Sequence, residues 1–187
     1  DALSESILNE ISSLMDKEGV SFRQVKKKSR EIVKRYAQIP LKKTDKPKVG
    51  VVGEIYVKYS PLGNNNLERF LIEEGAEPVV PGLYDFLLYC IYDGIIAKEL
   101  YGEKKFKGFL SKLACKILVK FQKKISDIVA EDGSFTPPTV FTELVAHVDD
   151  SIIGIGTKMG EGWLLPAEML ELYHSGVKNI GCAKPLG

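Results

Sequence analysis

The side chains in this sequence with the chemistry to hold a transition metal belong to three cysteines and two histidines. Cys90 and Cys115 stand among apolar neighbours in segments of helical periodicity, which is typical of small core residues. Cys182 follows a short apolar run and precedes the Pro/Gly turn 183–187, where a thiolate could bind a metal while backbone N–H groups donate to its sulfur. One cysteine does not make a metal site, and the residues by themselves favour a buried structural role for Cys182.

The histidines stand far apart in the sequence and away from the cysteines. We therefore do not expect His147 and His174 to form a zinc set with them. His174 comes shortly before Gly176, at the end of a predicted helix, where a positive charge would complement the helix dipole. Spacing reveals neither a Ser/His/Asp arrangement nor a pair of carboxylates, and no catalytic residue is assigned.

Polar side chains near two predicted helix starts are candidates for binding a cofactor. Glu54 follows the apolar run 49–52 and is either a lone acid or base, or a partner for a nearby helix N-terminus. Asn64, Asn65 and Asn66 precede a predicted helix, and asparagine both caps helices and tolerates left-handed backbone. A cap needs only one asparagine, so the other two leave room for anion binding by the helix N-terminus.

The glycine-rich loop 154–162 is the second candidate for phosphate binding. Its first seven residues resemble G-x-G-x-x-G but contain one residue too many, so the motif is a weak signal. The loop holds Lys158 and leads through Glu161 and Gly162 into a predicted helix. Glu161 is either part of a cofactor site or an acidic residue that complements the dipole of that helix.

The elements that position these residues begin with two predicted helices in the first forty residues. Gly19 ends the first helix and Ser21 is expected to cap the second. The first helix is indicated by apolar residues at helical spacing: Leu3, Ile7, Ile11 and Leu14. Together with the polar linker Lys42–Lys48 these helices form a predicted N-terminal segment over residues 1–46.

Three short apolar runs without polar alternation, 49–52, 78–80 and 179–182, are typical of strands buried on both faces. A helix predicted over 67–74 separates the first two, so we expect a parallel pair with a right-handed crossover. Ligands bind beyond the carboxyl ends of such strands. Parallel strands would therefore direct Glu54 and Cys182 into one crevice.

A long helical hairpin is predicted between the second and third strands. Its first helix, 83–100, is apolar on most sides and is expected to be buried. The second carries an apolar stripe at spacings of three and four: Phe106, Phe109, Leu110, Leu113, Ile117, Phe121, Ile125 and Ile128. Its other faces carry many lysines, which favours an amphipathic surface helix, with docking of an acidic partner as the alternative. Further helices are predicted over 139–149 and 163–174.

Composition excludes several classes of function. The chain has 26 basic and 25 acidic residues, a net charge of +1, so no global field favours nucleic acid or acidic lipid. No apolar run reaches the length of about 20 residues that a membrane span requires. The three cysteines are odd in number and widely separated, so no disulfide framework is predicted. Because no secretory signal is visible at the start either, a cytoplasmic location is favoured.

Several stretches resemble the 2-hydroxyacyl-CoA dehydratase and activase proteins. They are Lys48–Tyr56, Asn64–Asn66, Gly75–Pro81 and Gly160–Leu165. More specifically, the chain is similar to the part of the large fused bacterial activases that lies beyond their ATP-binding region. The resemblance runs from Lys48 to Gly187 and is thinnest over the lysine-rich helix.

The resemblance implies a three-layer, doubly wound α/β fold of the Rossmann type, with helices on both faces of a short, mostly parallel sheet and the helical hairpin as an addition. The domain 47–187 would then be dehydratase-like and end before its C-terminal part is complete. In this family an ATP-dependent activase passes one electron to a dehydratase that carries [4Fe–4S] clusters. Cys182, Pro185 and Gly187 match a family stretch Cys-x-x-Pro-x-Gly, after which relatives continue with another cysteine. The activase's ATP-binding motifs and cluster cysteines have no counterpart here, so ATP hydrolysis is not expected.

The leading hypothesis is a fragment of an iron–sulfur protein for ATP-driven, low-potential electron transfer, inactive by itself. The intact protein would hold a [4Fe–4S] cluster with Cys182 as one ligand, and the fragment would not. Expected partners are the rest of the parent chain, with its ATP-binding domains, and a CoA thioester or dehydratase, but neither nucleic acid nor membrane. The alternatives are a nucleotide- or CoA-binding module and a non-catalytic docking domain, and whether the chain is an enzyme stays open.

Overall fold

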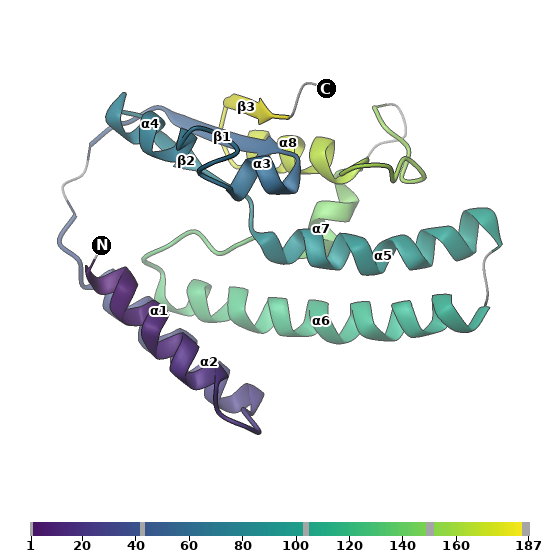
Figure 1. Cartoon of the computed structure of the whole chain (residues 1–187), viewed down its shortest axis with the longest axis horizontal. Helices are drawn as coiled ribbons and strands as arrows, with labels where there is room; N and C mark the ends of the chain where they lie inside the picture. Colours follow the sequence, from purple (N-terminus) through teal and green to yellow (C-terminus); the bar gives the residue numbers. More distant parts are fainter. Residues whose placement is uncertain (1, 42–43, 103–104, 149–151, 185–187) are drawn as a thin grey trace. The chain divides into compact units, whose positions relative to one another are not determined.

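The computed structural model describes residues 2–41, 44–102, 105–148 and 152–184, which fall into two compact units (Figure 1). One unit combines Asp1–Lys42 with Phe121–Pro138, and the other combines Lys43–Lys120 with Thr139–Gly187. The described part of the chain is mixed α/β and mainly helical, with a small open sheet of three parallel strands. The segment 121–138 therefore joins the N-terminal helices, although it comes after two strands in the sequence.

The first unit contains α1 (Ala2–Met15), α2 (Phe22–Ala37) and the last part of α6 (Lys105–Asp132). Both predicted N-terminal helices are confirmed. Ser21 caps α2 as predicted, because its hydroxyl accepts from Gln24 N while the Gln24 amide accepts from Ser21 N at 2.8 Å. Within this unit the Phe22 ring stacks on Phe121 of α6 at 4.3 Å between ring centres. This contact gives α2 an apolar attachment to α6.

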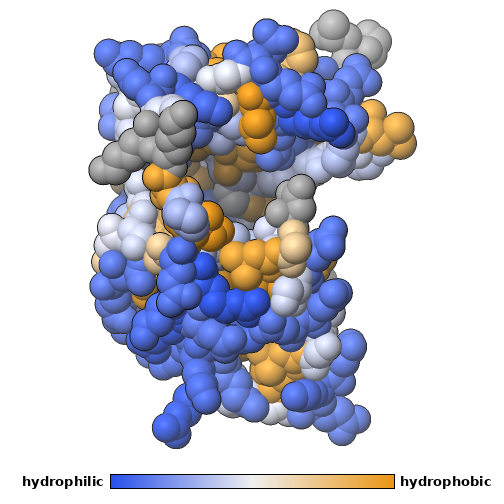
Figure 2. Space-filling view, turned by 90° about the vertical axis from the view of Figure 1, so that its left-hand side faces the viewer, coloured by the Kyte–Doolittle hydropathy of each residue, from blue (hydrophilic) through white to orange (hydrophobic). Residues whose placement is uncertain are grey.

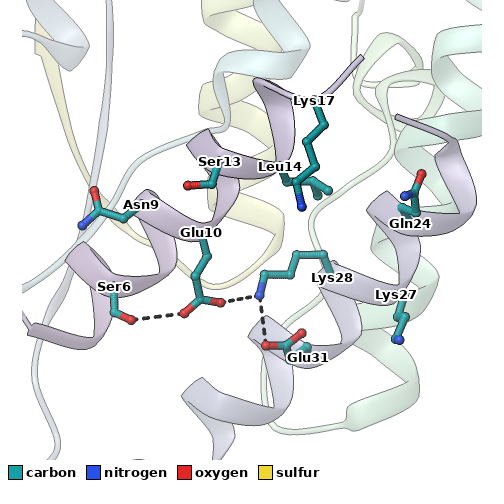
Figure 3. Close-up of a pocket in the computed structure, with 10 residues that line it drawn as sticks. All are labelled: Ser6, Asn9, Glu10, Ser13, Leu14, Lys17, Gln24, Lys27, Lys28 and Glu31. Carbon is teal, nitrogen blue, oxygen red and sulfur yellow. Dashed lines mark hydrogen bonds and ion pairs between the residues drawn. The ribbon is translucent and has the colours of Figure 1, made fainter. Parts of the chain in front are cut away.

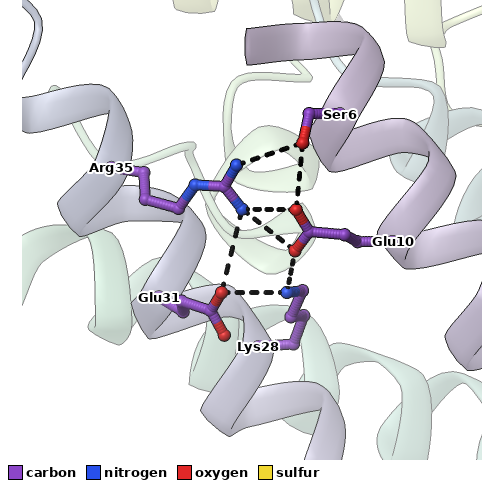
Figure 4. Close-up of polar contacts among 5 residues, drawn as sticks. All are labelled: Ser6, Glu10, Lys28, Glu31 and Arg35. Carbon is purple, nitrogen blue, oxygen red and sulfur yellow. Dashed lines mark hydrogen bonds and ion pairs between the residues drawn. The ribbon is translucent and has the colours of Figure 1, made fainter.

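A network of charged side chains links α1 to α2 (Figure 4). The Glu10 carboxylate accepts two hydrogen bonds from Arg35 Nη1, at 2.8 and 2.9 Å, and one from Lys28. Lys28 also donates to Glu31 at 3.0 Å. The hydrogen bonds from Lys28 and Arg35 lower the pKa of Glu10 to about 2. The two helices thus meet through a cluster in which one carboxylate serves two cations.

The sheet belongs to the second unit and has the order β2-β1-β3. Its strands are β1 (Lys48–Gly53), β2 (Glu77–Val79) and β3 (Asn179–Ala183), all three parallel, as the sequence predicts. In register, Val49 lies opposite Pro78 of β2, and Val52 lies opposite Cys182 of β3. The central position of β1 explains its unbroken apolar run, since both neighbours and both faces remove it from water.

Helix α8 (Leu164–His174) covers the sheet, with Leu165 and Leu172 packed against Val52. Two short helices, α3 (Ile55–Tyr59) and α4 (Leu67–Glu73), lie between β1 and β2. The second of these confirms the helix predicted over 67–74. The first, α3, is not among the elements predicted from the sequence.

The larger core of this unit surrounds Trp163, whose side chain is fully buried. Tyr89 and Tyr92 of α5 (Leu83–Tyr101) approach its ring edge-on, at 5.2 and 5.9 Å between ring centres. Phe141, from α7 (Phe141–Ala146), lies 6.0 Å from the same ring. Helix α7 is shorter than the predicted 139–149, a range whose last residue lies outside the described part of the chain. These aromatic contacts bring α5, α7 and the start of α8 together.

Helix α6 presents its apolar stripe to solvent over the segment 106–117, and the expectation that this stripe is the packed face is wrong there. Helix α5 and the part of α6 in the same unit, up to Lys120, lie side by side (Figure 1), and the α6 residues turned toward α5 include the buried Gly108 and Cys115. The stripe residues keep large exposed fractions: Phe106 77%, Phe109 63%, Leu110 54%, Leu113 46% and Ile117 45%. Small residues allow the close approach of the two helices, so they and not the large ones face α5.

Apolar side chains also reach the surface in separate patches among hydrophilic areas on the face drawn in Figure 2. Among the described helices, none has a stretch long and apolar enough to cross a lipid bilayer.

Candidate functional site

Three of the predicted cofactor-binding residues, Glu54, Asn64 and Glu161, gather around α3, the short helix at the carboxyl end of β1. Glu54 is the N-cap residue of α3, and its Oε2 accepts from Val57 N at 2.9 Å. Glu161, from the distant glycine-rich loop, accepts from Ile55 N through Oε1 at 3.0 Å and is 9% exposed. Two carboxylates thus satisfy two of the N–H groups that a helix leaves free at its start. Their observed role is to support α3.

A buried ion pair connects the same helix, α3, to α8. Lys58 of α3 donates through Nζ to both carboxylate oxygens of Glu168 on α8, at 2.8 and 3.0 Å, and the side chains are 2% and 3% exposed. Burial raises the pKa of Glu168, and the Lys58 charge opposes part of that shift. The Lys58 ammonium also lies 5.0 Å from the centre of the Tyr59 ring. The pair connects the end of β1 to the helix that covers the sheet.

Tyr59 completes the anchoring of α3. Its hydroxyl donates to the carbonyl of Pro81, in the segment that follows β2. Burial raises the pKa of Tyr59 well above its ordinary value, so the group remains a donor at neutral pH. Sequence reasoning missed Lys58, Tyr59 and Glu168. Lys58 and Glu168 are too far apart in the sequence for any local motif to indicate that they form a pair.

Asn64, Asn65 and Asn66 form the turn between α3 and α4. The Asn64 amide donates to the carbonyls of Val57 and Lys58 at 2.8 and 3.2 Å, and its Oδ1 accepts from Leu67 N at 3.1 Å. Asn65 and Asn66 have left-handed backbone, with φ of 54° and 56°. Asn66 is the N-cap residue of α4 but makes no capping bond with its side chain. The structure therefore places Asn64 as a clamp on α3, with its polar atoms already used by backbone groups.

The glycine-rich loop closes on itself where it meets α8. Trp163 N donates to Thr157 O at 2.8 Å, and Gly162 has a φ of 44°. A Cβ at Gly162 would lie 2.1 Å from Thr157 O, so only glycine fits this crossing. Tyr89 also donates to the carbonyls of Lys158 and Gly160, at 2.9 and 3.1 Å. Gly162 thus lets Glu161 reach α3 while Trp163 enters the core.

Cys182 lies on β3, which pairs with β1 on the side opposite to β2. Its thiol is exposed and in no disulfide, contrary to the buried structural role favoured by the residues alone. Gly53 ends β1 beside Ala183, whose carbonyl accepts from Glu54 N at 3.0 Å. The carboxyl ends of β1 and β3 are thus adjacent, although Glu54 turns its carboxylate toward α3.

Cys182 fits one position in the ligand set of an iron–sulfur cluster, because its thiol is accessible and at a strand end. A [4Fe–4S] cluster takes about four thiolates. Within the described residues, no group of three or more His, Cys, Asp or Glu side chains is arranged to hold a metal ion. Any cluster would therefore need ligands from outside these residues.

The first unit contains a concavity with charged walls. It is a groove of about 730 Å³ between α1 and α2, whose walls include Glu10, Lys28 and Lys17 (Figure 3). Its central carboxylate is already bound by Lys28 and Arg35. The groove thus reflects how α1 meets α2, and none of the predicted site residues lines it.

Comparison with known proteins adds no relative to this picture: no family model, no curated protein and no solved structure matches the chain.

Proposed function

We propose that this chain is part of an iron–sulfur protein of the 2-hydroxyacyl-CoA dehydratase activator kind, which takes part in ATP-driven, low-potential electron transfer in the cytoplasm. Cys182 contributes one thiolate to a [4Fe–4S] cluster, and the other ligands come from outside the described residues. The small sheet is then the centre of a three-layer, doubly wound domain, with α5 and α6 as its added hairpin. The resemblance of Lys48–Tyr56 and the other matching stretches to that family is the starting point.

The position of Cys182 carries the proposal. Parallel pairing puts this cysteine at the carboxyl end of β3, beside the end of β1, where open α/β sheets bind their ligands. Its thiol is exposed, whereas Cys115 is buried in the core. An exposed thiol at a strand end is accessible to a cluster, and iron–sulfur clusters are held by cysteine thiolates.

The test uses the full-length product of the open reading frame that encodes these residues, purified without oxygen. We expect bound iron, acid-labile sulfide and the visible absorption of a cluster that bleaches on reduction. Full-length protein without iron, sulfide or that absorption after anaerobic reconstitution would reject the proposal.

A second candidate function is docking, and the exposed stripe on α6 favours it. Lys112, Lys116 and Lys120 recur every four residues, so they follow one flank of the stripe from Phe106 to Ile117. Two copies meeting antiparallel through this stripe would place these lysines against each other. The partner that fits is an amphipathic helix with apolar anchors and an acidic flank.

Charge reversal tests this second function. A partner identified by its retention on the immobilised chain is purified, and its affinity is measured by calorimetry at low and high salt. We expect the triple variant Lys112→Glu, Lys116→Glu, Lys120→Glu to lose binding, and salt to weaken the wild-type complex. The control reverses three exposed lysines elsewhere, Lys17, Lys46 and Lys178. Equal affinity of both variants, or a dimer of the chain itself, would reject docking of an acidic helix.

A further inference from the structure

The two histidines of the chain, far apart in the sequence, come together in the second unit. Their ring centres lie 4.9 Å apart, with an angle of 48° between the ring planes. His147 is the C-cap residue of α7, and His174 is the last residue of α8. These are the only histidines in the sequence. The sequence analysis weighed each histidine only against the cysteines, and their contact with each other is new.

The separation of the rings suits a shared metal ion. A first-row metal binds an imidazole nitrogen at about 2.0–2.1 Å, and the ring centre lies about 1.2 Å behind that nitrogen. Two imidazoles on adjacent positions of one ion, at angles between square and tetrahedral, therefore have ring centres roughly 4.5–5.2 Å apart. The observed 4.9 Å falls within that range.

The electrostatic surroundings also favour a cation. Both imidazoles stand at helix C-termini, where the last carbonyl groups carry partial negative charge. His147 is half-buried and His174 is exposed, so an ion can reach them and keep water as its remaining ligands. Packing already holds the two helices together, so the rings are close to each other before any ion binds.

That packing is independent of the histidines. Leu144 of α7 is 3% exposed within the core, and Ala167 of α8 belongs to the same cluster. Thr139, just before α7, donates to the Glu171 carboxylate of α8 at 2.7 Å. The fold thus brings the two histidines together without a metal, and a bound metal would add a further link between α7 and α8.

We propose that His147 and His174 form a two-imidazole site for a late first-row divalent cation, with Cu²⁺ and Ni²⁺ bound more tightly than Zn²⁺. Imidazole ligands suit these ions, and the preference follows the general order of affinities for nitrogen sites. No third side-chain ligand joins the pair within the described residues, so water completes the coordination. This site is separate from Cys182 and does not depend on the iron–sulfur proposal.

The test is a titration of the untagged full chain with Ni²⁺ and Cu²⁺ by calorimetry, after alkylation of the exposed thiols of Cys90 and Cys182. We expect one equivalent to bind, and His147→Asn or His174→Asn each to weaken binding about tenfold or more. The control Tyr173→Phe changes a ring next to His174 but keeps both imidazoles, and should bind as the wild type does. Electron paramagnetic resonance of the Cu²⁺ form should show two nitrogen ligands, and one in each single variant.

A second readout guards against misfolded variants. Metal that binds only the native state raises its stability, so Ni²⁺ should raise the melting temperature of the wild type and of Tyr173→Phe but not of the histidine variants. Equal affinity of wild type and both histidine variants would place the ion elsewhere and overturn the proposal. So would the absence of binding at millimolar metal.

Discussion

Two ion-pair clusters, one in each unit, use the same kinds of side chain in opposite surroundings. Lys58 and Glu168 are almost fully buried, with exposed fractions of 2% and 3%. The side chains of Glu10 and Lys28, between α1 and α2, have exposed fractions of 35% and 19%. A buried ion that loses its partner has no water to replace it, whereas a surface ion does. The buried pair therefore decides whether α3 keeps its place, and the surface cluster only adjusts how α1 meets α2.

The two carboxyl groups also respond to pH with opposite signs. Burial raises the pKa of Glu168, so the folded chain holds that proton more tightly than the unfolded chain, and its contribution to stability falls as the pH rises above 4.5. Hydrogen bonds from Lys28 and Arg35 lower the pKa of Glu10 to about 2, so its contribution is present above 4.5 and is lost as the pH falls toward 2. Acidification should therefore weaken the first unit as Glu10 is protonated, whereas Glu168 is protonated at a higher pH and its protonation favours the folded chain.

The largest effect is expected from breaking the buried pair. Lys58→Met leaves the Glu168 carboxylate buried without its cation and should lower the free energy of unfolding by about 3–5 kcal/mol. The double variant Lys58→Met, Glu168→Leu removes both charges and should recover most of that loss. Urea unfolding followed by fluorescence of Trp163, the only tryptophan, measures both. A single variant as stable as the wild type would show that the pair is not desolvated as the structure indicates.

A smaller effect is expected at the junction of β1 and α3. Gly53 has a φ of 146°, and a Cβ there would lie 1.9 Å from the carbonyl oxygen of Ala183. Gly53→Ala should therefore cost about 1–3 kcal/mol of stability, measured as above. The control is Gly75→Ala, where φ is also positive, at 84°, but no atom lies within 4 Å of the added carbon. Equal losses in the two variants would show that backbone strain alone, and not the contact with β3, accounts for the cost.

The cap contributed by Glu161 should matter less than either. Glu161→Ala leaves Ile55 N without its acceptor, which should cost about 1–2 kcal/mol. Glu161→Gln keeps an acceptor oxygen and should recover part of the loss. Faster amide hydrogen exchange in α3 should accompany the alanine variant, and unchanged exchange there would contradict the assignment of Glu161 as a cap.

The smallest effect is expected in the surface cluster, and salt and pH reveal it best. Glu10→Gln should slightly loosen α1 and α2 at neutral pH, with a difference from wild type that shrinks as salt is added. The variant should also lose the weakening of this unit between about pH 5 and about pH 2 that the lowered pKa of Glu10 produces in the wild type. Hydrogen exchange of α1 and α2 amides reports it, with Glu5→Gln as the control. Identical pH profiles for wild type and Glu10→Gln would contradict this account.

The sheet and the long helices could be predicted from the sequence, because short apolar runs and helical periodicity are local signals. Helix α3 could not, since its Ile-Tyr-Val-Lys-Tyr sequence has the β-branched and aromatic residues typical of strands. It is helical because distant groups support it: Glu161 accepts from its first N–H, and Glu168 binds Lys58. No local pattern contains that information.

Part of the candidate site could be predicted from the sequence, but the roles of its residues could not. Glu54, Asn64 and Glu161 do meet around one element, yet all three hydrogen bond to the backbone of α3. Sequence position marks residues at the ends of strands and helices, and such residues serve caps as readily as ligands. The prediction from the apolar stripe on α6 has a similar limit. Periodicity shows that these residues share one face of the helix, but not whether that face points to the core or to solvent.

The most direct test of the central claim compares Cys182→Ser with Cys90→Ser in the full-length protein. Both cysteines are exposed, but only Cys182 stands at a strand end, so the comparison separates the effect of position from that of exposure. Iron and acid-labile sulfide are measured for both after the same anaerobic purification. We expect Cys182→Ser to lose cluster iron and Cys90→Ser to retain the wild-type amount. Full cluster content in Cys182→Ser would contradict the assignment of this thiolate as a ligand.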